Sequence, residues 1–197
     1  MFDTPAEAAL HVIRLRAGLG VEPLAKILGM PPQEARVLVD TIREAGLVRA
    51  VRGNWIVTSD GIAADDAAVE RWRDHAEPRD LELVEQFDRS FIGPNEAVKA
   101  TISRWQSHRA TLSTDEIATE LHIAVSQLTF PLGAHTGVAR VFDDYRERLL
   151  KLLDHAAGGD DSAISGIRAE SFHQVWMELH AELLQLSGRA RTAADGY

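Results

Sequence analysis

The sequence predicts a mainly helical protein with two parts: an N-terminal part that ends in a small β-hairpin, and a longer C-terminal part of antiparallel helices. Three features indicate this fold class. Apolar residues recur at helical spacing along most of the 197 residues. One pair of β-prone runs flanks a Gly-Asn turn. The charge is also divided: residues 1–62 hold seven basic and seven acidic side chains, whereas the remainder holds 14 and 23 and carries the whole net charge of −9.

The overall composition excludes several classes of protein. Hydrophobic residues make up 45% of the chain and charged residues 26%, which is typical of a folded globular protein. Because there is no cysteine, disulfide scaffolds, thiolate metal sites and cysteine nucleophiles are excluded. No apolar run approaches the roughly 20 residues of a membrane span, and Asp3 and Glu7 stand where a signal peptide would be basic. We therefore expect a cytoplasmic protein with no membrane partner.

Three helices and a hairpin are predicted within residues 1–62. The first helix begins at Thr4-Pro5, an N-cap followed by proline at the first helical position. A short helix over 21–28 and a third helix over 33–45 follow, each ended by a glycine. The runs 47–51 and 55–58 then flank the turn Arg52-Gly53-Asn54. This order is that of a winged helix-turn-helix, in which the hairpin forms the wing.

Two segments carry a family resemblance. The run "LAKILGMPPQEARVLVDTIREAGLV" resembles the two helices of the DNA-reading motif in the MarR-like winged-helix superfamily, with its turn at Gly29-Met30. The run "GNWIVTSDG" resembles the outer strand of the wing. Together with the first helix the resemblance covers about sixty residues, and it implies that this part binds double-stranded DNA.

Candidate DNA contacts follow from how such a motif works. A helix fits the major groove, and its exposed N-terminal side chains reach the edges of the bases. The candidates on the third helix are Gln33, Arg36, Thr41 and Arg43, and those on the hairpin are Arg49, Arg52 and Asn54. Glu34 and Asp40 on the same helix would repel phosphate, so an adaptor that binds a partner protein stays open. A continuous basic stripe over 31–55 would favour DNA, and an acidic or apolar face would favour the adaptor.

The C-terminal part is predicted as a linker helix over 63–78, an antiparallel helical bundle over 79–190 and a mobile tail over 191–197. Within the bundle, Gly93-Pro94 is expected to kink or end one helix, and Asn95 to cap the next run. We expect this part to form a homodimer and to sense a small molecule. Two copies are expected because one winged helix contacts only half of a DNA site.

The segment "SFHQVWMELHAELLQLSGR" places His173, Trp176 and His180 on one helical face, with Glu178 and Glu182 on a neighbouring, solvated face. It resembles the C-terminal helix of an actinobacterial group of winged-helix regulators, and "RWQ" at 104–106 resembles a "DWQ" element of that group. The chain departs from the group after this element, because it has "SHRATLSTDE" where the group often has an Asn-Asp-His loop.

Three interpretations of this stripe stay open. It forms a ligand pocket with Trp105, His173, Trp176 and His180 as its lining; or it is core; or it takes part in a metal site. His173 and His180 are about 10.5 Å apart along the helix at 1.5 Å per residue, too far for paired ligation. A metal would therefore need ligands such as Glu120, His122 or His135, and we expect no metal or other cofactor.

No nucleotide-binding, nucleophile-elbow or kinase motif occurs in the sequence, so we do not expect an enzyme. The leading hypothesis is a DNA-binding transcriptional regulator. The alternatives are the protein-interaction adaptor and a small metal-binding protein or enzyme built on the helical part.

Overall fold

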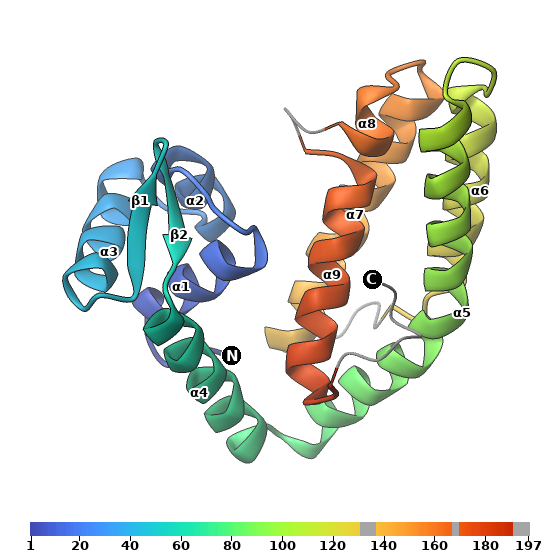
Figure 1. Ribbon diagram of the computed structural model, residues 1–197. Coiled ribbons are helices and arrows are strands. Elements are labelled where there is room, and N and C mark those ends of the chain that lie inside the picture. The colour runs from blue at the N-terminus through green and yellow to red at the C-terminus, as the bar shows by residue number, and fades with distance from the viewer. Residues whose placement is uncertain (131–136, 167–169, 191–197) are drawn as a thin grey trace. The chain divides into compact units, whose positions relative to one another are not determined.

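The computed structural model describes residues 1–130, 137–166 and 170–190. This part of the chain is mainly helical and contains a two-stranded antiparallel sheet, as the sequence predicts (Figure 1). The chain divides into two compact units, Met1–Ala76 and Glu77–Tyr197. The tail predicted over 191–197 lies outside the described residues.

The elements of the first unit, in chain order, are α1 (Pro5–Leu15), α2 (Val21–Leu28), α3 (Pro32–Glu44), β1 (Val48–Val51), β2 (Asn54–Val57) and α4 (Ser59–His75). Helix α1 begins with a capping box, in which the Thr4 hydroxyl accepts from the Glu7 amide and the Glu7 carboxylate accepts from the Thr4 amide. Helix α2 ends at Gly29, whose φ of 65° lies in the left-handed region open to glycine. That conformation turns the chain from α2 into α3.

The core of the first unit is formed where α1, α2 and α3 face one another. Ile13 of α1, Leu24 of α2 and Val39 of α3 are among its fully enclosed side chains. Strands β1 and β2 pair in register from Val48↔Val57 to Val51↔Asn54. Leu19, between α1 and α2, exchanges two backbone hydrogen bonds with Trp55, with N···O distances of 3.0 and 2.9 Å. The segment before α2 therefore lies along β2, on the side away from β1.

Helix α4 packs on α1 through a buried ionic contact. The Asp65 carboxylate, 1% exposed, lies 3.0 Å from Nδ1 of His11 and accepts from the Arg14 guanidinium at 2.8 Å. At the start of α4, a methyl group on Gly61 would stand 2.0 Å from the Leu47 carbonyl oxygen. Only glycine allows this approach. Most of the residues predicted as a linker over 63–78 thus belong to α4, which lies within the unit Met1–Ala76.

The second unit contains α5 (Pro78–His108), α6 (Thr114–Ser126), α7 (Gly137–Ala157), α8 (Ser162–Ser165) and α9 (Phe172–Ser187). Helix α5 packs against α6, α7 and α9, and α7 packs against α6 and α9. The rings of Phe87 on α5 and Phe142 on α7 stack with their centroids 4.4 Å apart. Apolar faces from several helices thus share one core.

Helix α5 continues through Gly93-Pro94, and Figure 1 shows it changing direction along its length. The expectation that Asn95 caps a new helix is wrong, because Asn95 is buried inside α5. Its side chain serves a tertiary contact instead of a helix end. Within the described residues, no helix combines the length and apolar character that crossing a membrane requires.

Candidate nucleic-acid interface

Helix α3 buries one narrow face and leaves the rest in solvent. Ala35, Val39 and Ile42 are its buried residues, and their spacing of three and four places them on a single side. The four candidate contacts on this helix, Gln33, Arg36, Thr41 and Arg43, are all exposed. Val37 lies among them and is 64% exposed, an unusual position for a large apolar side chain.

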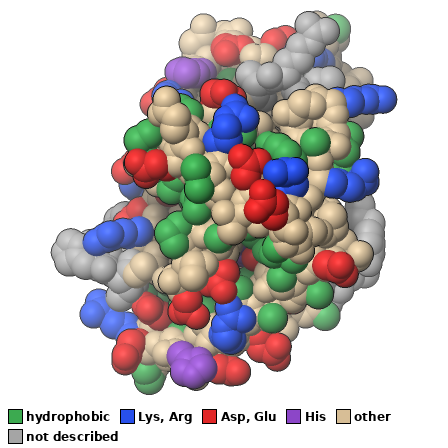
Figure 2. Space-filling model, turned by 90° about the vertical axis from the view of Figure 1, so that its left-hand side faces the viewer, with side chains coloured by type: hydrophobic (Ala, Val, Ile, Leu, Met, Phe, Trp, Pro, Cys, Tyr) green, Lys and Arg blue, Asp and Glu red, His purple; other side chains and the backbone are tan. Residues whose placement is uncertain are grey.

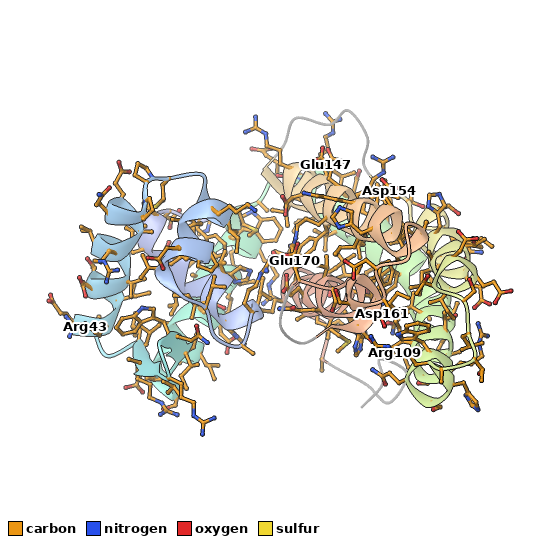
Figure 3. The ribbon with its side chains drawn as sticks, turned by 90° about the horizontal axis from the view of Figure 1, so that it is seen from above. Arg43, Arg109, Glu147, Asp154, Asp161 and Glu170 are labelled. Carbon is orange, nitrogen blue, oxygen red and sulfur yellow. The ribbon has the colours of Figure 1, made fainter. Side chains whose placement is uncertain are left out.

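The charged side chains of α3 differ in their partners. Arg43 lies 3.4 Å from the Asp40 carboxylate and 3.6 Å from that of Glu44, and Figure 3 shows it projecting from the end of the helix. The side chains of Gln33 and Arg36 make no hydrogen bond or ion pair with the described part of the chain. The first turns of α3 therefore present polar groups that the fold itself does not use.

The hairpin presents the remaining candidates, Arg49, Arg52 and Asn54, all exposed. Arg52 and Gly53 form the turn with φ values of 51° and 84°. Two positive φ values are typical of the tight turn that matches the twist of a hairpin. Neither Arg49 nor Arg52 has an ionic partner among the residues that the structure describes. The turn thus holds an uncompensated guanidinium at the tip of the sheet.

The surface over 31–55 carries four arginines and three carboxylates, so it is close to neutral. Figure 2, which looks onto the side where α3 lies, shows acidic and basic side chains interspersed with apolar ones. This is neither the continuous basic stripe expected for DNA nor an acidic face. The uncompensated positive charge is confined to Arg36, Arg49 and Arg52.

In the second unit, Trp176 is enclosed by other aromatic rings. It is 1% exposed and stacks on Phe91 and Phe172, with centroid distances of 4.9 and 5.7 Å. Its indole Nε1 donates to Oδ1 of Asn95 at 3.0 Å. His180 is also buried, and its ring lies 5.0 Å from that of Phe91. The structure therefore brings Trp176 and His180 together on one segment of α5.

Trp105 lies elsewhere on α5. It is ten residues beyond Asn95, about 15 Å along the axis at 1.5 Å per residue. Its ring packs under Arg109, whose Nε donates to Asp161 at 3.0 Å, and Figure 3 shows these two charged groups side by side. Trp105 is buried, and its Nε1 has no hydrogen-bond partner in the described part of the chain. It is thus about three helical turns from the contact that holds Trp176.

His173 is half-buried, and this burial lowers the pKa of its imidazole. Glu178 and Glu182, expected on a solvated face, are instead buried, so that expectation is wrong. The reason for Glu178 is Arg148 of α7, whose Nη2 donates to it at 2.6 Å and to Glu170 at 2.8 Å. Burial alone would lower the pKa of the Arg148 guanidinium, but the two carboxylates together outweigh it and raise that pKa.

The described residues, 1–130, 137–166 and 170–190, contain no candidate metal site. No group of three or more His, Asp or Glu side chains among them is placed to hold an ion. His135, one of the ligands considered, lies outside these residues.

No family model matches the chain, and comparison with curated proteins and with solved structures gives no match either.

Sequence reasoning missed several residues that matter. The exposure of Val37 could have been found, because Ala35, Val39 and Ile42 define a buried face that excludes it. The roles of Asn95 and Arg148 could not, because their partners are 81 and 30 residues away in the chain.

Proposed function

We propose that the first unit binds double-stranded DNA as a winged helix, and that the chain is a transcriptional regulator. One observation carries the proposal: the exposed side of α3 and the hairpin present Gln33, Arg36, Arg49 and Arg52, whose side chains have no partner in the described chain. The order α1, α2, α3, β1, β2, with Leu19 paired to Trp55 beside the hairpin, is also the order of winged-helix domains.

The chemistry of these side chains fits the two tasks of a DNA reader. Near the start of α3, Gln33 can pair with the N6 and N7 positions of adenine, and Arg36 with the O6 and N7 positions of guanine. Arg49 and Arg52 on the hairpin are suited to phosphate, which fixes register without reading sequence. Thr41, Arg43 and Asn54 complete the proposed surface.

The charge of the molecule limits how it would bind. DNA repels a chain of net charge −9 at long range, so attraction is limited to the neighbourhood of the basic side chains. If Arg49 and Arg52 each neutralise one phosphate, the logarithm of affinity should fall with the logarithm of salt concentration with a slope of about −1.8 for each bound copy.

We propose that the second unit joins two copies, because one winged helix covers only half of a useful site. The close packing of Trp176 among Phe91, Phe172 and Asn95 favours the interpretation of its stripe as core over that of an effector pocket. We therefore leave a small-molecule effector out of the proposed mechanism.

Fluorescence anisotropy with duplexes from upstream of the protein's own gene tests the proposal. Wild-type protein should bind at low salt. Arg36→Ala with Arg52→Ala should weaken binding, because a base contact and a phosphate contact are lost, and should reduce the salt slope by about 0.9 for each bound copy. The matched control is Arg79→Ala with Arg140→Ala, which removes the same charge from exposed positions of the second unit and should leave the slope unchanged.

A protein-interaction adaptor is the second candidate, and Val37 favours it. This side chain is 64% exposed, between Glu34 and Asp40 on the solvent face of α3. An apolar centre with an acidic rim is suited to a protein partner. If the wild-type protein binds none of the duplexes at low salt, the regulator is refuted and the adaptor takes its place.

A further inference from the structure

Helix α5 carries a stripe of side chains that the described residues of the second unit leave largely in solvent. The stripe consists of Leu81, Glu85, Arg89, Ile92, Glu96 and Lys99, spaced by steps of three and four, so that these residues share one helical face. Ile92, near its middle, is 56% exposed, and Leu81 is 38% exposed. The core residues of α5, such as Phe87 and Val98, project to another side.

The charges along this stripe are arranged so that two antiparallel copies would be complementary. From the N-terminal end, the order is Glu85, Arg89, Ile92, Glu96 and Lys99, so an acid and then a base lie on each side of Ile92. A second copy laid antiparallel, with Ile92 opposite Ile92, would place Arg89 against Glu96 and Glu85 against Lys99. A parallel copy would instead place each charge against its like. Within one chain, Arg89 pairs with Glu85 at 3.2 Å and Lys99 with Glu96 at 2.7 Å. Arg89, Glu85 and Glu96 are exposed, and Lys99 is half-buried. Pairs at the surface contribute little to stability, so a pairing with a second copy can replace them at little cost.

We propose that this stripe of α5 is a self-association surface, on which a second copy of the chain binds antiparallel about a two-fold axis at Ile92. The four charges of the stripe sum to zero in a chain of net charge −9, so two copies can meet there without the repulsion that their overall charge creates. The inference rests on the proposed function only in the role given to the dimer, which is to hold together two N-terminal units that each bind DNA.

Cysteine cross-linking tests the axis directly, because the chain contains no other thiol. In Ile92→Cys, the two thiols should lie across the axis and form a disulfide-linked dimer under mild oxidation. The matched control is Ile123→Cys on α6, which is 54% exposed but lies outside the stripe, and it should remain uncross-linked under the same conditions.

Charge reversal tests the pairing. Arg89→Glu sets acid against acid, and Glu96→Arg sets base against base, so each variant alone should dimerise about tenfold more weakly in sedimentation experiments. An equimolar mixture of the two should recover dimers, because both cross-helix contacts are then of opposite charge. An effect within one chain cannot produce this recovery, so the mixture distinguishes the interface from a loss of the Glu85–Arg89 pair.

The proposal is overturned if the wild-type chain remains monomeric throughout the micromolar range, if Ile92→Cys cross-links no better than Ile123→Cys, or if mixing gives no recovery. Its failure is separable from that of the proposed function. A dimer through α5 that binds no DNA refutes the regulator alone, and DNA binding by a dimer formed elsewhere refutes the interface alone.

Discussion

Helices α3 and α9 use charged side chains in opposite ways. Helix α3 buries three of its 13 residues, and α9 buries ten of its 16. On α9 the Glu178 carboxylate is buried against Arg148, whereas on α3 the Arg36 guanidinium is in solvent without a partner in the described chain. A charge that is buried and paired within the fold cannot lose its partner without leaving an uncompensated charge behind. A charge that the fold leaves exposed and unpaired is available to a partner.

The largest effect should come from the core of α9. Replacing Trp176 by Ala removes a ring stacked between Phe91 and Phe172, and it leaves the Asn95 amide without its indole donor. We expect a loss of about 3–5 kcal/mol in the free energy of unfolding, measured by urea denaturation.

Trp176→Phe is the control, since it keeps a ring but not the indole N–H, and it should lose less stability than Trp176→Ala. If Trp176→Ala unfolds at the same urea concentration as the wild type, the rings of Trp176, Phe91 and Phe172 do not form a core. The contrast between a buried α9 and an exposed α3 then fails.

The next effect concerns arginines within the proposed DNA surface. Arg52 has no ionic partner in the described chain, whereas Arg43 lies near Asp40 and Glu44. Arg52→Ala should therefore reduce the salt slope of DNA binding by about 0.9. Arg43→Ala should change it by less than half as much, because its charge is already partly neutralised. Equal slopes for the two variants would show that pairing within the chain does not determine which arginines bind phosphate.

A smaller effect should come from Val37. An exposed apolar side chain in the major groove is suited to the methyl group of thymine. Replacing one thymine of a bound duplex by deoxyuridine should cost the wild type about 0.8 kcal/mol, or about fourfold in affinity, at the contacted position. Val37→Ala should show little loss on the same replacement. A scan in which no thymine position responds would remove Val37 from the reading surface and favour its role in a protein contact.

The smallest effect concerns His173. Burial lowers the pKa of its imidazole, so protonation is less favourable in the folded state than in the unfolded state. The stability that comes from keeping this imidazole neutral is fully present above pH 6.5, the ordinary pKa of histidine. It is lost as the pH falls through the lower pKa that His173 has in the folded state. The urea midpoint should decline less between pH 7 and pH 5 in His173→Gln than in the wild type. A steeper decline in the variant would contradict this assignment.

Local signals in the sequence predicted the helices and the hairpin of the first unit well. Thr4-Pro5, Gly29 and the Gly53 turn act on their immediate neighbours, so their effect is visible in the sequence. The second unit depended on contacts between distant residues. Pro94 predicted a break or a kink, and α5 continues through it as one helix that changes direction, whereas the contact of Asn95 with Trp176 of α9 could not be predicted.

The candidate site divides in the same way. All seven predicted DNA contacts are exposed. For the four on α3, helical periodicity alone separates the buried face from the solvent face. The four residues predicted to line one pocket do not share one place: Trp176 and His180 lie together, and Trp105 lies about three turns away along α5. The spacing of His173, Trp176 and His180 along α9 does not indicate where Trp105, a residue of α5, lies relative to them.

Selection from a library of random DNA duplexes tests the central claim most directly, namely that the exposed face of α3 and the hairpin read DNA. The account predicts that the wild-type protein enriches a pair of symmetric half-sites about 10 base pairs apart, and that Arg36→Ala with Arg52→Ala loses the enrichment. Failure of the wild type to enrich any sequence at low salt, or enrichment of the same sequence by the variant, would contradict it.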